Sequence, residues 1–195
     1  MELPDSLVAY LTAINPLTPE TWAKASALFR TIELDRGDHL VPPGRPATQL
    51  GLLESGWVRA YHVSASGSEY SKHLFRAPAL VGDYASLLTG EPVRTPQQAL
   101  TPVTVHVAEW ARVVALFDEH RDLERLARRF AELLYLDNER REIELVTLPA
   151  SERLRLLSER HPTIDRDLPL FQIAAHLGIT PTQLSRIRRR QGSST

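Results

Sequence analysis

The sequence contains no cysteine and only one methionine among its 195 residues. Without a thiol, the chain has no disulfide, thiolate zinc site, iron–sulfur cluster or cysteine nucleophile. A long apolar run is missing too, because His106, Glu109 and Arg112 interrupt the most apolar stretch, Val103 to Phe117. The N-terminus also lacks the basic and apolar regions of a signal peptide. We therefore expect a cytoplasmic protein with no membrane partner and no thiol-based redox sensor.

Composition indicates an ordinary folded protein, with 43% hydrophobic and 24% charged residues. The net charge of −1 argues against a protein that coats polyanions in general. This average hides an asymmetry, because the chain from Leu168 onward contains no acidic residue and four arginines. Such a cluster is most often a solvated helix end, and its surroundings decide whether it does more.

The first two thirds of the chain give mainly strand signals after a helical start. Ser6 to Ala13 predicts a helix, and Thr18 can cap a second helix that begins at Pro19. From about Thr31, short β-like runs alternate with turns rich in glycine and proline. These runs are Ile32–Leu34, Leu50–Leu53, Trp57–Val63, Glu69–Phe75 and Val103–Val107. Their spacing favours an antiparallel β-roll of the jelly-roll type, followed by helices from Trp110, so the expected fold class is α+β.

A long helix follows the β region. Leu123, Leu126, Phe130 and Leu133 recur at alternating steps of three and four residues, which gives a narrow apolar seam. Periodicity leaves two alternatives open, namely packing against the chain's own β domain and a two-helix dimer interface. Further along, Ser151 predicts the cap of a new helix, and the segment 161–165 is expected to be a linker.

The C-terminal segment has the pattern of two short helices around a tight turn. Ile173, Ala174 and Leu177 form the apolar face of the first helix, and Ala174 is small where another helix would cross closely. Gly178 stands where the chain must reverse, a position that commonly needs a positive φ angle. Ile179 is expected to fill the contact between the two helices.

The second helix of this pair has a clear start and two distinct faces. Thr180 and Gln183 form a capping box around Pro181, while Leu184 and Ile187 face inward. A basic outer face on the second of two such helices is typical of a helix-turn-helix that reads a major groove. Arginine can hydrogen-bond to guanine, glutamine can hydrogen-bond to adenine, and hydroxyl groups can hydrogen-bond to phosphates or base edges. The residues that we assign to DNA are Thr180, Thr182, Gln183, Ser185, Arg186, Arg189 and Arg190.

The segment from Ile173 to Arg188 resembles the helix-turn-helix of the Crp/Fnr family of bacterial transcription regulators. The similarity extends over nearly the whole chain, because Gly37–Asp38, Glu54–Gly56 and Val81–Asp83 resemble turns of that family's cyclic-nucleotide-binding-like β-roll. The resemblance implies an effector β-roll with N-terminal helices at residues 1–117, a dimerisation helix at 118–147 and a helix-turn-helix domain at 148–195.

In this family the long helix forms a homodimer, which places Leu123, Leu126, Phe130 and Leu133 in a dimer interface. The resemblance also implies double-stranded DNA and RNA polymerase as partners, together with a small-molecule effector of unknown identity. One departure is Thr182, which stands where many relatives carry a glutamate that can accept from cytosine. The family's usual half-site therefore does not carry over.

The β-roll resembles a cyclic-nucleotide site in which a glutamate binds ribose and an arginine neutralises the phosphate. The matching residues here are Asp83, Arg94 and Thr95, but Asp83 is shorter and Arg94–Thr95 comes one residue late. We expect a loop that no longer binds cyclic AMP. His39, His62, His73 and His106 are conceivable axial haem ligands, but a lone histidine is more often a surface or core residue, so no cofactor is expected.

An enzyme is not expected, because a cupin-type metal site needs a histidine pair and a carboxylate that the sequence does not provide. The sequence thus predicts a homodimeric, sequence-specific DNA-binding transcription regulator that does not depend on cyclic AMP. The alternative is a cyclic-nucleotide-responsive sensor that acts through protein contacts and retains a vestigial helix-turn-helix.

Overall fold

The computed structural model describes residues 3–64, 67 and 69–192. The first two and last three residues of the predicted domain ranges lie outside this description. The chain forms two compact units. The first comprises residues 1–60 and 74–134, and the second comprises residues 61–73 and 135–195. Nowhere in residues 3–64, 67 and 69–192 is a helix both long and apolar enough to cross a membrane.

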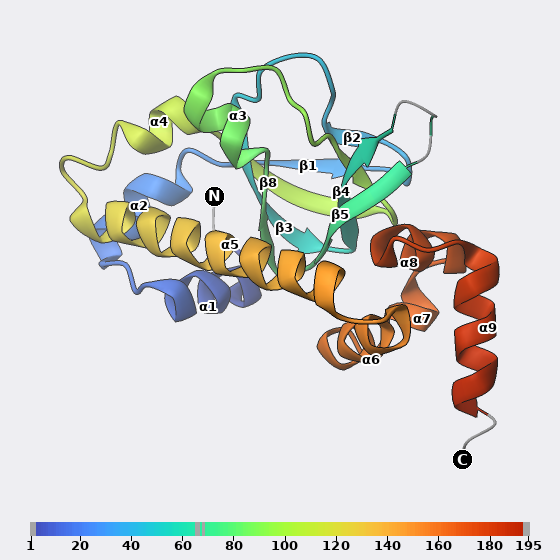
Figure 1. The fold of residues 1–195 in the computed structure, drawn as a ribbon. Helices are drawn as coiled ribbons and strands as arrows, with labels where there is room; N and C mark the ends of the chain where they lie inside the picture. Colours follow the sequence, from blue (N-terminus) through green and yellow to red (C-terminus); the bar gives the residue numbers. More distant parts are fainter. Residues whose placement is uncertain (1–2, 65–66, 68, 193–195) are drawn as a thin grey trace. The chain divides into compact units, whose positions relative to one another are not determined.

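Two four-stranded sheets organise the β-rich part of the chain (Figure 1). One sheet has the strand order β1-β8-β3-β6, and the other has the order β2-β7-β4-β5. The register determined for β1–β8, β3–β8, β3–β6, β2–β7 and β4–β7 is antiparallel throughout. The strands are β1 (Arg30–Leu34), β2 (His39–Val41), β3 (Gln49–Ser55), β4 (Trp57–Val63), β5 (Glu69–Arg76), β6 (Ala79–Val81), β7 (Gln97–Ala99) and β8 (Val103–Glu109). The expected α+β class with an antiparallel β-roll is thus confirmed.

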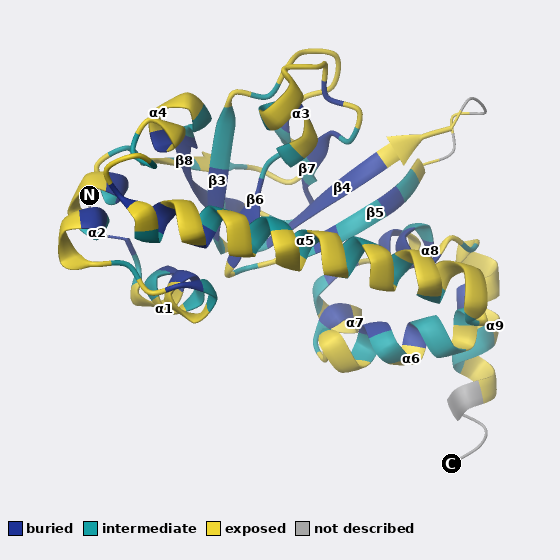
Figure 2. Ribbon diagram, turned by 60° about the vertical axis from the view of Figure 1, so that its left-hand side comes forward, coloured by how far each residue is buried: buried dark blue, intermediate teal, exposed yellow. Residues whose placement is uncertain are grey.

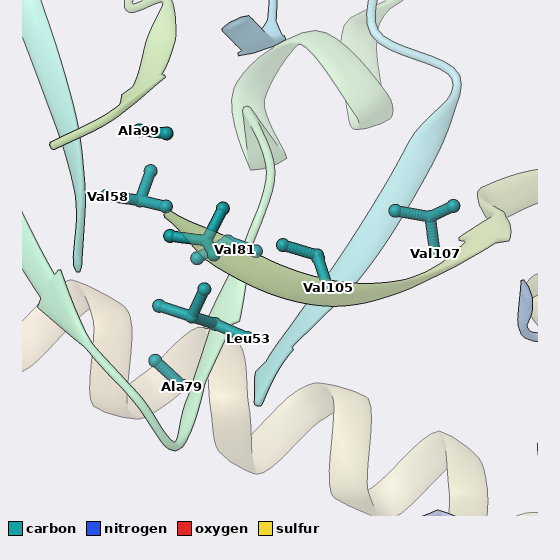
Figure 3. Packing of buried hydrophobic residues seen from close by; sticks show 8 residues of the cluster. Leu53, Val58, Ala79, Val81, Ala99, Val105 and Val107 are labelled. Carbon is teal, nitrogen blue, oxygen red and sulfur yellow. The ribbon is translucent and has the colours of Figure 1, made fainter. Parts of the chain in front are cut away.

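The core of the β-roll joins the inner faces of both sheets. Leu53, Val58 and Val105 are fully buried, and Figure 3 shows Leu53, Val81 and Val105 close together between the strands. Gly51 lets these strands approach, because a Cβ atom there would lie 2.8 Å from Val81 and 2.9 Å from Val105. Any larger residue at position 51 would therefore push β3 away from its neighbours.

Helices flank this core in the first unit. They are α1 (Asp5–Ile14), α2 (Pro19–Ser26), α3 (Tyr84–Thr89), α4 (Trp110–Val114) and α5 (Arg121–Thr147), whose last thirteen residues belong to the second unit. Both predicted N-terminal helices are confirmed, and the hydroxyl of Thr18 accepts a hydrogen bond from the Thr21 amide as the expected cap. The three-residue strands β2, β6 and β7 escaped prediction because they are too short to show alternation.

The second unit is mainly helical. Its elements are the C-terminal part of α5, α6 (Ala150–Arg160), α7 (Ile164–Asp167), α8 (Leu170–Leu177) and α9 (Pro181–Gly192), together with the adjoining ends of β4 and β5. The predicted cap at Ser151 is wrong, because the helix begins two residues earlier than this cap implies and Pro149 occupies the cap position without a side-chain bond. The expected linker is also partly helical, since α7 begins at the fully buried Ile164.

Arg141 of α5 joins the β5 end of this unit to α8. One of its amino groups, Nη2, donates to the hydroxyl of Tyr70 at 2.8 Å and to the carbonyl oxygens of Ser71 at 3.2 Å and His176 at 2.9 Å. Its Nη1 lies 2.8 Å from Nε2 of His176. An arginine can only donate, so this imidazole nitrogen is the acceptor. The other nitrogen, Nδ1, therefore carries the proton and donates to the Ser71 carbonyl at 2.9 Å.

This arrangement keeps His176 neutral. Burial, and secondly the charge of Arg141, hold the pKa of His176 well below its ordinary value. His73 and His161 add smaller contributions in the same direction, while the bond to Ser71 opposes them. Burial also lowers the pKa of His73, against the hydrogen bond that its Nε2 makes with Asn138 at 3.0 Å.

Both histidines make folding depend on pH in the same sense. An unfolded histidine takes up a proton as the pH falls through about 6.5, whereas the native forms of His73 and His176 do so only at lower pH. Their contribution to stability is thus fully present above about pH 6.5 and is lost as the pH falls toward the native pKa values.

We expect His176→Gln to weaken this pH dependence, because glutamine cannot take up the proton. Below about pH 6.5, each neutral buried histidine lowers the free energy of unfolding by up to about 1.4 kcal/mol per pH unit. The variant should lose one such contribution and retain that of His73. Urea denaturation followed by circular dichroism between pH 7.5 and 5 measures the slope, and equal slopes for both proteins would contradict the assignment.

Candidate nucleic-acid interface

The first helix of the candidate site, α8, is anchored by buried apolar side chains. In α8, Ile173 and Ala174 are completely buried and Leu177 nearly so, as the apolar pattern predicts. Gly178 then adopts a left-handed conformation with φ 68°, and the Ile179 amide donates back to the Ala174 carbonyl at 3.1 Å. This bond satisfies one of the carbonyl groups that the end of a helix leaves open. The predicted glycine turn is confirmed.

The second helix, α9, begins with the predicted capping box. The Thr180 amide donates to Oε1 of Gln183 at 2.9 Å, and the Gln183 amide donates to Oγ1 of Thr180 at 3.2 Å. Thr180 and Gln183 are both among the residues that we assign to DNA contact, and in the structure their hydrogen bonds define the N-terminus of α9. Leu184 is completely buried and anchors the inner side of α9.

One face of α9 is open to solvent, as Figure 2 shows by the yellow of its outer surface. Residues three and four positions apart share a helix face. Thr182, Ser185, Arg186 and Arg189 therefore form one stripe opposite Leu184, and all four are exposed. Gln183 and Arg190 are exposed on the flank of this stripe. We call the four stripe residues and these two flanking residues the basic face.

Arg188 has a different role from its neighbours. It forms an ion pair with Asp165 of α7, on the side of α9 away from the basic face. This pairing ties α9 to the short helix α7 within the second unit. Arg188 thus makes its contact inside the second unit, whereas Arg186 is exposed on the basic face.

The predicted dimer seam needs a correction. Leu123 and Leu126 are each only 7% exposed, and Leu126 packs with Leu7 and Leu52 of the same chain. Phe130 packs against this cluster and makes an edge contact with Tyr84 at 6.1 Å between ring centroids. For these three residues the first alternative holds, namely packing within the chain, and a charge at Phe130 would disrupt the core.

The apolar surface of α5 continues beyond this buried part. Leu133 is 51% exposed, Leu136 56%, Ile143 55% and Val146 80%. Their spacing of three and seven residues keeps Leu136 and Ile143 on one side of the helix. In the sequence, the apolar repeat that predicts the seam ends at Leu133, because the charged residues Asp137 and Arg140 occupy the next two positions of that repeat. We call Leu133, Leu136, Ile143 and Val146 the exposed stripe of α5.

Two of the three residues matched to a nucleotide site make other contacts. Asp83 is 9% exposed and caps α3 by accepting from the Ser86 amide at 3.3 Å. The Arg94 side chain is 82% exposed and pairs with Glu91 at 3.2 Å. Thr95, next to it, is half-buried. The carboxylate is thus engaged in a helix cap, and the guanidinium lies at the surface.

A fourth residue, Gln97, closes the same turn. Its Oε1 accepts from the Gly82 amide at 2.9 Å, and its Nε2 donates to the Gly82 carbonyl at 2.9 Å. A phosphate bound at this turn needs backbone amides as donors. Here the Gly82 amide is already satisfied by a side chain that is 3% exposed.

His106 and His73, two of the conceivable haem ligands, make polar contacts within the chain. His106 is 4% exposed, and its Nε2 lies 2.7 Å from Glu54 while its Nδ1 lies 3.0 Å from the Thr31 hydroxyl. His73 contacts Asn138 and lies 3.6 Å from Asp137. His39 is half-buried and His62 is exposed, on different strands.

Comparison with known proteins connects these features to a family of folds. The model of the cyclic nucleotide-binding domain matches residues 31–120. Among curated protein sequences, none matches the chain significantly. FixK2 from Bradyrhizobium japonicum is 16% identical with a TM-score of 0.73, over 85% of either chain.

Two further solved structures extend the match over more of the chain. The c-di-GMP-responsive global regulator CLP of Xanthomonas campestris is 18% identical with a TM-score of 0.69, over 91% of this chain and 93% of CLP. A protein of Eubacterium rectale described as a transcriptional regulator of the crp/fnr family is 16% identical with a TM-score of 0.67, over 91% of this chain and 85% of that one. Residues 31–120 are therefore similar to a cyclic nucleotide-binding domain, and the chain has the fold of the Crp/Fnr regulators.

Proposed function

We propose that the protein is a transcription regulator that binds DNA as a homodimer and does not require cyclic AMP. The observation that carries this proposal is the basic face of α9, which lies on the second helix of a helix-turn-helix and opposite the buried Leu184. Such a helix fits the major groove, and its arginine, glutamine and hydroxyl groups match the donors and acceptors of base edges and phosphates.

The exposed stripe of α5 supports the homodimer. A row of large apolar side chains exposed along a helix costs free energy in water and is typical of a surface that another chain covers. Leu133, Leu136 and Ile143 follow coiled-coil spacing and Val146 lies beside them, so a second copy of α5 is the matching partner. Two recognition helices in one dimer would read half-sites about one helical turn apart.

The proposed independence from cyclic AMP rests on the loop that joins β6 to β7. A cyclic phosphate needs an arginine directed toward it and free backbone donors. Arg94 is paired with Glu91 at the surface, and Gln97 occupies the Gly82 amide. These contacts also weigh against the alternative of a cyclic-nucleotide-responsive sensor that acts through protein contacts.

Selection of bound duplexes from a random DNA pool, with and without cyclic AMP at one salt concentration, tests the function. The proposal predicts that a palindrome is enriched without the nucleotide, with half-site centres about 10–10.5 base pairs apart. Enrichment that requires cyclic AMP would overturn the independence from the nucleotide. Failure to enrich any sequence in either condition would count against DNA reading itself.

Arg186→Ala should weaken binding to the selected operator more than binding to random DNA. A bidentate arginine–guanine contact is worth about 1–3 kcal/mol of discrimination, roughly a 5- to 150-fold loss of specificity. Arg188→Ala is the matched control, because it removes the same charge from the same helix on the side that faces Asp165. Fluorescence anisotropy with operator and random DNA measures the ratio of the two affinities. An equal loss of specificity in both variants would contradict the role of Arg186.

Arg189→Ala and Arg190→Ala should act mainly through phosphate contacts. Each is expected to reduce the slope of log affinity against log salt by about 1, with a similar loss on operator and random DNA. Titrations over a series of salt concentrations give this slope. An unchanged slope in both variants would show that these guanidinium groups do not neutralise phosphates.

Ile143→Glu should convert the dimer to a monomer, because the carboxylate would be buried against an apolar partner surface. Glu142→Ala, at the neighbouring exposed position outside the stripe, should leave the dimer intact. Light scattering coupled to size exclusion gives the mass, and circular dichroism verifies the fold. A dimeric Ile143→Glu protein with native helicity would rule out this surface as the interface.

A further inference from the structure

A small cavity in the second unit is lined by charged side chains. It has a volume of about 20 Å³, and all of its lining residues come from α5, α6 and α8 of that unit. Its polar groups belong to Arg141 and Glu144 of α5, Arg153 and Arg160 of α6, and His176 of α8. Three leucine side chains complete the wall. The cavity is thus separate from both the basic face of α9 and the exposed stripe of α5.

Among the residues that the structure describes, two of these three arginines have no carboxylate partner. Both oxygens of Glu144 accept from Arg160, and Arg140 lies 3.9 Å from the same carboxylate, so the charge of Glu144 is already balanced. Arg141 donates only to uncharged groups, namely a phenol hydroxyl, an imidazole nitrogen and two carbonyl oxygens. Arg153 likewise donates to three leucine carbonyl oxygens, at 2.6, 2.9 and 3.2 Å. Two positive charges at this cavity are therefore left without a counter-ion.

Arg153 also has a donor that the protein does not use. Its Nε is buried and has no hydrogen-bond partner within residues 3–64, 67 and 69–192. A buried donor without an acceptor destabilises the folded chain, and a buried charge is normally paired. An acceptor that also carries a negative charge would meet both requirements at once.

The size of the cavity limits what this acceptor can be. About 20 Å³ is enough for one particle of the size of a water molecule. Phosphate, sulfate and carboxylate ligands have several heavy atoms and need more room. A water molecule could accept from Nε of Arg153, but it would balance neither of the two guanidinium charges. A halide ion is small enough, carries one negative charge and accepts hydrogen bonds from any direction.

We propose that this cavity is a binding site for a monatomic anion of the size of chloride. The ion accepts from Nε of Arg153 and balances the charges of Arg141 and Arg153, which lie on different helices. It thereby strengthens the packing of α5 and α6 with α8, the helix that leads through Gly178 into α9. The site does not rest on the proposed function, because none of its groups is assigned to DNA.

Urea unfolding at constant ionic strength tests the site in solution, with potassium chloride replacing potassium gluconate stepwise. An ion that binds only the folded chain multiplies the folding equilibrium constant by one plus the ratio of its concentration to Kd, about elevenfold at about ten times Kd. Arg153→Gln should lose this response, because it removes the Nε donor and one of the two charges. Arg155→Gln makes the same change at an exposed position of α6 outside the lining, and it should respond as the wild type does.

Two results of this experiment would overturn the site. One is a wild-type equilibrium constant that does not change with chloride at constant ionic strength. The other is an equal response of the wild type and both variants, which would indicate a general salt effect.

A second measurement covers the case in which Arg153→Gln does not fold. Crystals of the wild-type protein soaked in potassium bromide should give an anomalous diffraction peak in the cavity, because bromide replaces chloride and scatters anomalously. A cavity that holds water without such a peak would refute the anion site. Because neither experiment contains DNA, a failure of DNA binding cannot be mistaken for a failure of anion binding.

Discussion

Arg141 satisfies four backbone or side-chain acceptors from segments that lie far apart in the chain, and the packing of the second unit depends on this one guanidinium. Its bonds to Tyr70 and Ser71 come from β5, while those to His176 come from α8. Because arginine has only donors, His176 must remain neutral and present an unprotonated Nε2. The position of α8 is thereby fixed, and with it the turn at Gly178 that sets the direction of α9.

The two halves of the long helix α5 have different roles. Its N-terminal half buries Leu123 and Leu126 against the first unit, which makes this half part of a core. Its C-terminal half supplies Arg141 to the second unit and leaves Leu136 and Ile143 in solvent.

Features formed by residues close together in the sequence could be predicted, whereas contacts between distant residues could not. The turn at Gly178 and the cap at Thr180 involve neighbours within four residues, so local chemistry predicts them and the structure confirms them. The partner of Leu126 is α1, more than a hundred residues earlier, and periodicity identifies an apolar stripe without identifying what covers it. The contact of Arg141 with His176 has no sequence signal, because its geometry arises only when α5 and α8 pack together.

The turn at Gly82 and the segment that follows it lack the arrangement that a cyclic phosphate needs. Binding a cyclic phosphate requires open backbone amides and a desolvated positive charge, and Gln97 removes the first while the surface pairing of Arg94 removes the second. Asp83 is likewise engaged, because its carboxylate caps α3. The polar groups of this turn thus hold the loop itself together, since Gln97 bonds both the amide and the carbonyl of Gly82.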